Sequence, residues 1–386
     1  MTLRDFVKAG ISKSYVSELE NGRKRATPEI AAALDRVLGS GGALAPLVQV
    51  CVGPNRRDAG DDAVSDDEQN AIELARRVHS SDVGAETLQR LEWAVDDLAI
   101  RYSVTPPADL LPRVRRHLSY VTDLLDAPVR KTLGEYRQLM IVGAWLSLLG
   151  ATLHIDLNQR PAGGALLATA ASLAREAEHD EIRAWCYETR AWDALMAGDY
   201  RRALEMSRTA QQVASVGGSA LIQATAQEGR AWARLGRPRE TTAVLRRVDR
   251  MVSMLERPER PEHHYRYDPD KSVAYTATTL AWIGDPAAEG YAREVIDRLR
   301  SAEGAGRWPR RVAAARMDLA LGLIAAGKHD EAVASALAAI LSGRIVPSNH
   351  WRAAEVLAAV EAKGLPESRD LRNAFEALCR GELTAR

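Results

Sequence analysis

Apolar side chains recur at helical spacing along almost the whole chain. In long segments rich in alanine and leucine they stand at positions i, i+3 and i+4, and Gly, Pro, Asn or Asp interrupts the segments at intervals. This spacing places the apolar side chains on one face of an α-helix, and the alternation that is typical of β-strands does not occur. The pattern predicts an all-α protein.

The helical segments form a repeat, and residues 184–211 are its clearest copy. Small Ala191 and Ala203 stand where the two helices of a hairpin would touch, and Gly198 stands at the turn between them. Five copies in register are recognisable, with predicted turns at Asn158, Gly198, Gly236, Gly284 and Gly327. Such self-similarity indicates a stack of helical hairpins. An irregular helical bundle with fortuitous spacing is the alternative.

This repeat resembles the tetratricopeptide (TPR) repeat, which has a period of 34 residues. The last four turn glycines are 38, 48 and 43 residues apart, so we expect inserted loops. The resemblance extends over residues 69–380 and implies a TPR-like α-solenoid. It is a generic resemblance, because it rests on small residues and turns rather than on a chemical motif.

A second motif lies near the start, in "GISKSYVSELENGRK" from Gly10. Ser12 is a good N-cap, an apolar helical stripe follows, and Gly22 stands where a helix ends. "TPE" from Thr27 opens the next helix with a cap and then a proline. Residues 10–36 resemble the Xre/Cro-type helix-turn-helix family. That family has five helices and the first is missing here, so we expect a chain start placed too far downstream and an N-terminally truncated domain.

The helix-turn-helix resemblance implies a recognition helix that enters the major groove of double-stranded DNA. Its exposed residues, which would read base edges, are Lys13, Ser14, Ser17 and Glu18. The residues just after the helix, which would contact phosphates, are Asn21, Arg23, Lys24 and Arg25. A merely solvated polar helix face is the alternative. Base contacts would set the sequence preference, and phosphate contacts would set the register on the duplex.

The two motifs divide the chain into three parts. We assign residues 1–48 to a partial helix-turn-helix DNA-binding domain without its first helix, and residues 69–380 to the TPR-like helical repeat domain. Residues 49–68 are polar, rich in Gly and Asp and without periodicity, which is typical of a linker.

Overall charge does not decide between partners, because Lys plus Arg and Asp plus Glu both total 52. The three cysteines, Cys51, Cys186 and Cys379, lie too far apart for a disulfide framework or a zinc site, which fits a reducing cytoplasm. We identify neither a secretory leader nor a run of 18 apolar residues, and so expect no membrane segment.

Residues 261–271, "PEHHYRYDPDK", carry several side chains that could bind a metal: His263, His264, Asp268 and Asp270. Adjacent histidines do not easily reach one ion, and two prolines bound the segment. A structural loop that expands the 48-residue spacing is the first interpretation. A lid that contacts a ligand and a metal site are the alternatives, and we expect no metal.

Aligning the repeats predicts which side chains face the concave groove of the stack. These are Trp185, Glu188, Trp192, Gln223, Arg230 and Lys271. Aromatic and charged side chains together suit a peptide or a small amphipathic ligand, and Glu188 favours one of mixed charge. A solvated inner face without a ligand is the alternative.

Together these features predict a cytoplasmic, homodimeric DNA-binding transcriptional regulator whose TPR domain binds a peptide, small molecule or protein partner. The alternative is a TPR protein-interaction scaffold whose DNA-binding domain is incomplete and inactive. An enzyme is not expected, because we find no nucleophile–base constellation, P-loop or Gly-rich dinucleotide turn. No cofactor is expected.

Overall fold

The computed structural model describes residues 19, 26–40, 43, 67, 69–72, 84–128, 131–301 and 308–383. It separates the chain into two compact units, Met1–Asp67 and Glu68–Arg386. The described residues form helices and turns and contain no strand, so the all-α prediction is confirmed.

The described part of the first unit is built around α3 (Pro28–Leu38). Thr27 caps this helix by accepting a hydrogen bond from the backbone N–H of Ile30 at 3.4 Å, and Pro28 occupies its first turn. Gly39 ends the helix in the left-handed conformation, with φ of 64°. The predicted cap-and-proline start is therefore confirmed.

The segment predicted to read DNA lies outside the described residues. This applies to all eight predicted DNA contacts, Lys13, Ser14, Ser17, Glu18, Asn21, Arg23, Lys24 and Arg25. Their roles stay predictions.

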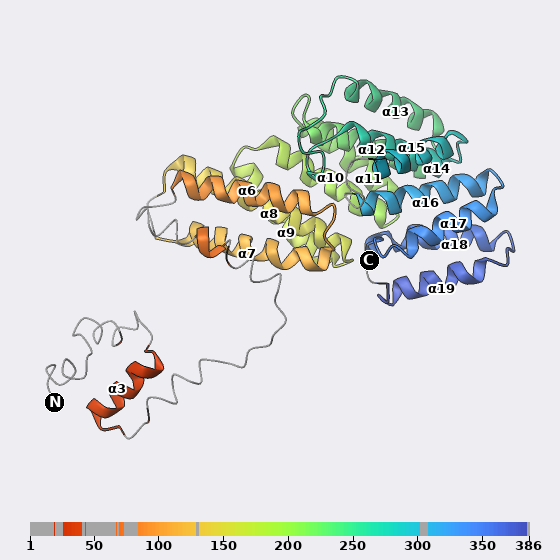
Figure 1. The fold of residues 1–386 in the computed structure, drawn as a ribbon. Coiled ribbons are helices and arrows are strands. Elements are labelled where there is room, and N and C mark those ends of the chain that lie inside the picture. The colour runs from red at the N-terminus through yellow and green to blue at the C-terminus, as the bar shows by residue number, and fades with distance from the viewer. Residues whose placement is uncertain are drawn as a thin grey trace. The chain divides into compact units, whose positions relative to one another are not determined.

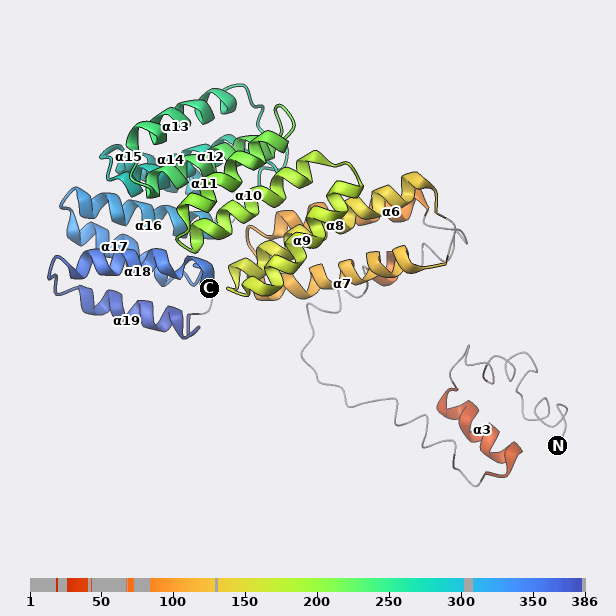
Figure 2. The same ribbon diagram turned by 180° about the vertical axis from the view of Figure 1, so that it is seen from behind.

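The second unit is a stack of antiparallel helix pairs, seven of them in its described part (Figure 1). The pairs are α6 (Ala85–Arg101) with α7 (Pro107–Asp126), α8 (Leu133–Asp156) with α9 (Arg160–Glu176), α10 (Asp180–Met196) with α11 (Tyr200–Val213), α12 (Ser219–Arg234) with α13 (Pro238–Val252), α14 (Pro269–Ile283) with α15 (Ala287–Ser301), α16 (Pro309–Ala325) with α17 (His329–Ile340), and α18 (His350–Glu361) with α19 (Ser368–Cys379). The even-numbered helices contact one another in sequence and form the inner layer, and the odd-numbered helices cover them. Figure 2 shows the same stack from behind.

All five predicted turns join the two helices of a pair. Each turn residue has a positive φ, from 59° at Asn158 to 79° at Gly198. Glycine adopts this conformation without a steric penalty and asparagine tolerates it better than most residues, so the chain can reverse within two or three residues. The turns are thus fixed by local sequence.

Helix α8 is the core helix of the first half of the stack. Thr132 and Glu135 form a capping box at its start. An 18-residue window of α8 is long and apolar enough to cross a membrane, with a mean hydropathy of 1.5. The window is not an unbroken apolar run, because polar residues such as Ser147 and Thr152 interrupt it. Since 78% of the window is buried inside the fold, α8 serves as a core helix.

The two ends of the stack meet. The inner helix α8 contacts the short 3₁₀ helix η1 (Pro347–Asn349), which precedes α18. Asp156 at the end of α8 is the centre of this junction, because it accepts hydrogen bonds from Tyr102 at 2.9 Å, Arg310 at 3.1 Å and Ser348 at 3.4 Å. The inner layer therefore closes on itself around a pocket.

Candidate ligand-binding site

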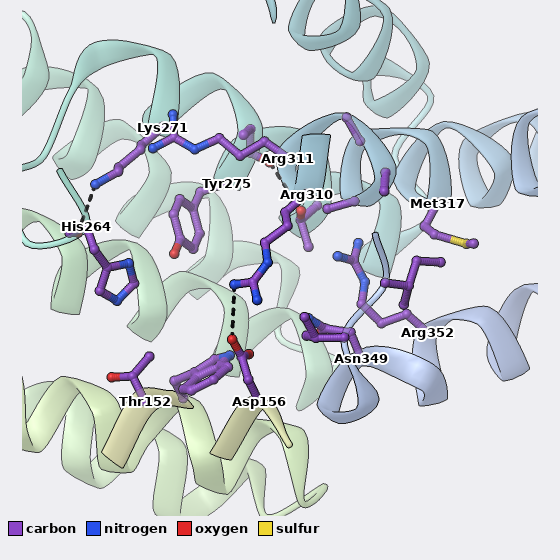
Figure 3. A pocket seen from close by; sticks show the side chains of 18 of the residues that line it. Thr152, Asp156, His264, Lys271, Tyr275, Arg310, Arg311, Met317, Asn349 and Arg352 are labelled. Atoms are coloured by element: carbon purple, nitrogen blue, oxygen red, sulfur yellow. Dashed lines mark hydrogen bonds and ion pairs between the residues drawn. The ribbon is translucent and has the colours of Figure 1, made fainter. Parts of the chain in front are cut away.

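A cavity of about 270 Å³ lies on the inner face of the stack. Its walls come from the inner helices from α8 to α18, from Tyr102, which follows α6, from the loop between α13 and α14, and from residues 344–349 before α18 (Figure 3). All six side chains that the repeat alignment placed in the groove line this pocket: Trp185, Glu188, Trp192, Gln223, Arg230 and Lys271. The structure thus brings them together, whereas their binding of a ligand stays a prediction.

The pocket wall is rich in charge. Its cationic side chains are Arg230, Lys271, Arg310, Arg311, Arg344 and Arg352, and its acidic side chains are Asp156, Glu188 and Asp318. Aromatic and aliphatic side chains fill the remaining wall, among them Tyr275, Trp192 and Met317. An apolar cavity with a few convergent charged groups is the usual form of a small-ligand site.

Gln223 links Glu188 to Tyr275 and so connects three inner helices, α10, α12 and α14, by hydrogen bonds. Gln223 Nε2 donates to Glu188 Oε1 at 3.0 Å and to the hydroxyl of Tyr275 at 2.6 Å. Burial raises the pKa of Glu188 to about 7, although Gln223, Arg230 and Lys271 act in the opposite direction. Glu188 therefore holds or releases a proton near neutral pH, which makes the charge of the pocket pH-dependent.

The raised pKa of Glu188 predicts a pH-dependent stability. Between its ordinary pKa of 4.5 and the folded value of about 7, the unfolded chain has lost this proton and the folded chain retains it. The free energy of unfolding should therefore fall as the pH rises through this window, by up to about 3 kcal/mol. Glu188→Gln should abolish that component in urea unfolding measured from pH 4.5 to 7.5.

The exposed Glu176 provides the matched control, because its side chain is 65% exposed. Glu176→Gln should keep the wild-type pH profile. Lys271 changes the free energy of unfolding in a different pH range, from about 7 to its ordinary pKa of 10.5, since burial lowers its pKa to about 7. Superimposable profiles for Glu188→Gln and the wild type would contradict the assignment.

Lys271 binds the loop between α13 and α14, while the ligand contact predicted for it stays a prediction. Its ammonium donates to the backbone carbonyls of Arg266 at 2.5 Å, His264 at 3.0 Å and His263 at 3.4 Å. The sequence alignment placed this residue correctly on the inner face but assigned its charge to the ligand. Three carbonyl partners use its three donors, so Lys271 primarily holds the loop between α13 and α14.

That loop is a buried wall of the pocket, in agreement with the structural interpretation of residues 261–271. His263 is 6% exposed and its Nε2 lies 3.1 Å from Asp96 Oδ1, while the backbone N–H of His264 donates to Ala99. Asp268 caps α14 and pairs with Arg311 at 3.3 Å. The loop also contacts the pocket directly through His264.

Among the described residues, no three His, Cys, Asp or Glu side chains are grouped so that they could hold an ion. Asp270 instead pairs with Arg257 at 3.0 Å and Arg298 at 3.1 Å.

The two predicted tryptophans differ in environment. Trp185 is only 2% exposed, packs edge-on against Tyr265 and donates its indole N–H to Glu181 at 3.1 Å. Trp192 is partly buried beside the cluster around Leu195. Trp185 therefore contributes mainly to the core, and only part of its surface borders the pocket.

Several pocket residues were missed by the sequence-based prediction. Arg310, Arg311 and Asp318 come from α16, Arg352 comes from α18, and Asp156 comes from α8. Their signal in the sequence is the presence of charged residues within alanine-rich or leucine-rich inner helices. Asp318 and Arg352 illustrate it, because both are nearly inaccessible to solvent and pair with each other.

Comparison with known proteins identifies the N-terminal segment. A helix-turn-helix family model matches residues 1–42. None of the curated proteins matches the chain. The chain therefore joins a helix-turn-helix segment to an α-helical repeat unit, and this combination supports a DNA-binding regulator rather than an enzyme.

Proposed function

We propose that this protein is a cytoplasmic transcriptional regulator that binds double-stranded DNA and responds to a ligand in its repeat domain. The observation that carries the proposal is the combination of a helix-turn-helix match over residues 1–42 with a charged, partly apolar pocket in a separate compact unit. We assign the repeat domain to the TPR type, because its paired helices turn at the positions that the TPR-like spacing predicts.

The proposed DNA interface consists of the eight residues between Lys13 and Arg25 that the family resemblance indicates. Lys13 would donate to guanine O6 or N7, whereas Arg23 would contact a phosphate. We further propose a homodimer, since dimers of this class place two recognition helices in successive major grooves. A peptide, small molecule or protein partner is the proposed occupant of the pocket.

DNA binding is tested by selecting sites from a random duplex library with the 386-residue chain. On a selected site, Lys13→Ala should lose about 1–3 kcal/mol of discrimination at one base pair. Arg23→Ala should instead weaken all sequences alike and reduce the slope of log K against log salt by about 1. Fluorescence anisotropy at several salt concentrations separates the two effects.

Arg380→Ala is the matched control, because this exposed arginine lies at the other end of the chain, beside Glu382. It should leave DNA binding unchanged. If no sequence is enriched and no salt-dependent binding is observed, the proposal of a DNA-binding regulator is contradicted. The alternative function, a TPR scaffold without DNA binding, would then be favoured.

A further inference from the structure

Among the described residues, the buried pocket cation Arg230 has no carboxylate partner. The buried Lys271 also lacks one, but three backbone carbonyls accept hydrogen bonds from its ammonium. Three of the pocket arginines are paired across the stack: Arg310 with Asp156 at 3.1 Å, Arg311 with Asp268 at 3.3 Å, and Arg352 with Asp318. Arg230 differs from them. No carboxylate oxygen of the described residues lies within 4.0 Å of its guanidinium group.

The surroundings of Arg230 hold its guanidinium in place without neutralising it. The side chain lies over the rings of Tyr275, at 5.1 Å, and Trp282, at 4.9 Å. Its Nη1 donates to Gln227 at 3.0 Å, and its buried Nε has no hydrogen-bond partner. The residue is only 7% exposed, so little water can solvate its charge in place of a carboxylate.

An isolated buried charge is unfavourable unless it is paired. Burial accordingly lowers the pKa of Arg230, and the neighbouring cation Arg352 acts in the same direction. Tyr275 and the carboxylates of Asp318 and Glu188, which do not form an ion pair with it, act in the opposite direction. A guanidinium that lies over two rings and has no ion-pair partner among the described residues is preorganised for a planar carboxylate, with which arginine forms two parallel hydrogen bonds. The missing partner is therefore supplied most simply by a ligand.

The acidic residues of the wall limit how much negative charge that ligand can carry. Asp156, Glu188 and Asp318 all line the same cavity. Asp156 and Asp318 already pair with Arg310 and Arg352, so these guanidinium groups are not free for a second negative charge, which disfavours phosphomonoesters and dicarboxylates. The rest of the wall includes aliphatic side chains such as Ala274, Ala314 and Met317, which suit an apolar body.

We propose that the pocket binds a monocarboxylate with an apolar body and that Arg230 pairs with the carboxylate group. This inference rests on the ligand-sensing part of the proposed function. Two sources share this chemistry: a free organic acid and the C-terminus of a short peptide.

The test compares acids with their neutral amides, so that only the charge of the probe changes. Isothermal titration calorimetry of the full chain uses phenylacetate against phenylacetamide, and the tripeptide Gly-Gly-Phe against its C-terminal amide. At least one acid should bind at least tenfold more tightly than its amide. If phenylacetate binds more tightly than the tripeptide acid, the source is a free organic acid. If the tripeptide acid binds more tightly than phenylacetate, the source is a peptide C-terminus.

Two variants locate the effect. Arg230→Gln should remove the preference for the acid, whereas Arg234→Gln should preserve it. Arg234 lies one helical turn further along α12 and also stacks on Trp282, at 4.1 Å, but it pairs with Glu355 and does not line the pocket. The comparison of acid with amide on the wild-type protein needs no variant, so a folding defect in Arg230→Gln does not obscure the result.

The proposal is overturned if acids and amides bind equally, if neither acid binds, or if Arg230→Gln retains the preference for the acid. Failure of the proposed function is a separate result. If the chain prefers acids through Arg230 but enriches no DNA sequence, the acid-binding pocket stands and the proposed function as a DNA-binding regulator is contradicted.

Discussion

Tyr265→Ala is expected to lower the free energy of unfolding by about 3–5 kcal/mol, in the range found for truncation of large buried aromatic side chains. Tyr265 is 4% exposed and anchors the loop between α13 and α14 in the core of the first half of the stack. Its ring lies 4.9 Å from that of Trp145, 5.2 Å from that of Trp185 and 4.7 Å from that of His264. Removing it leaves a cavity beneath the pocket wall.

Urea unfolding followed by circular dichroism measures this loss. Tyr291→Ala is the control, because Tyr291 is 38% exposed on the outer helix α15, and it should cost less than about 1 kcal/mol. A loss for Tyr265→Ala as small as that of the control would mean that the loop is not held by its aromatic anchor.

Asp318→Ala is expected to be at least as damaging, with a loss of about 3–5 kcal/mol, because it leaves the guanidinium of Arg352 buried without a counter-charge. Asp318 is 2% exposed and bridges three inner helices: it accepts hydrogen bonds from Arg352 on α18 and, at 2.6 Å, from Thr278 on α14. The same unfolding experiment measures the loss.

A double variant separates loss of the pair from loss of packing. Asp318→Leu combined with Arg352→Met replaces both charges with apolar side chains and should recover most of the stability, because no buried charge is left unpaired. Glu331→Ala breaks an exposed pair with Arg293 at 2.7 Å and should cost at most about 1 kcal/mol. A double variant no more stable than Asp318→Ala would contradict this account.

The fold was largely predictable because its determinants are local. Helical periodicity and the five turn residues, from Asn158 to Gly327, depend only on neighbouring residues, and each turn was found where it was predicted. The start of α3 was predictable for the same reason, since Thr27 and Pro28 act within one helical turn. Local signals of this kind do not depend on how the helices pack.

The pocket was predictable only in part. Alignment of the repeats placed residues of α10, α12 and α14 on the inner face, because a helix face follows from the sequence spacing. It could not supply Arg310 or Ser348 as neighbours of α8, since that proximity arises from the curvature of the whole stack. The contacts between Lys271 and the loop were not predictable for a similar reason, because the three carbonyls it binds converge only when the loop folds back.

The junction at Asp156 also determines how this domain folds. An open row of repeats has contacts only between neighbours, so it can nucleate at any point and lose its terminal repeats one at a time. Here Asp156 bonds to residues 154 and 192 positions further along the chain, so the ends of the row are coupled. Contacts of such long sequence separation raise the contact order and slow folding, because the chain between them must first be ordered. We therefore expect fraying of the last hairpin to expose the end of α8 as well, so that the stack unfolds as one cooperative unit.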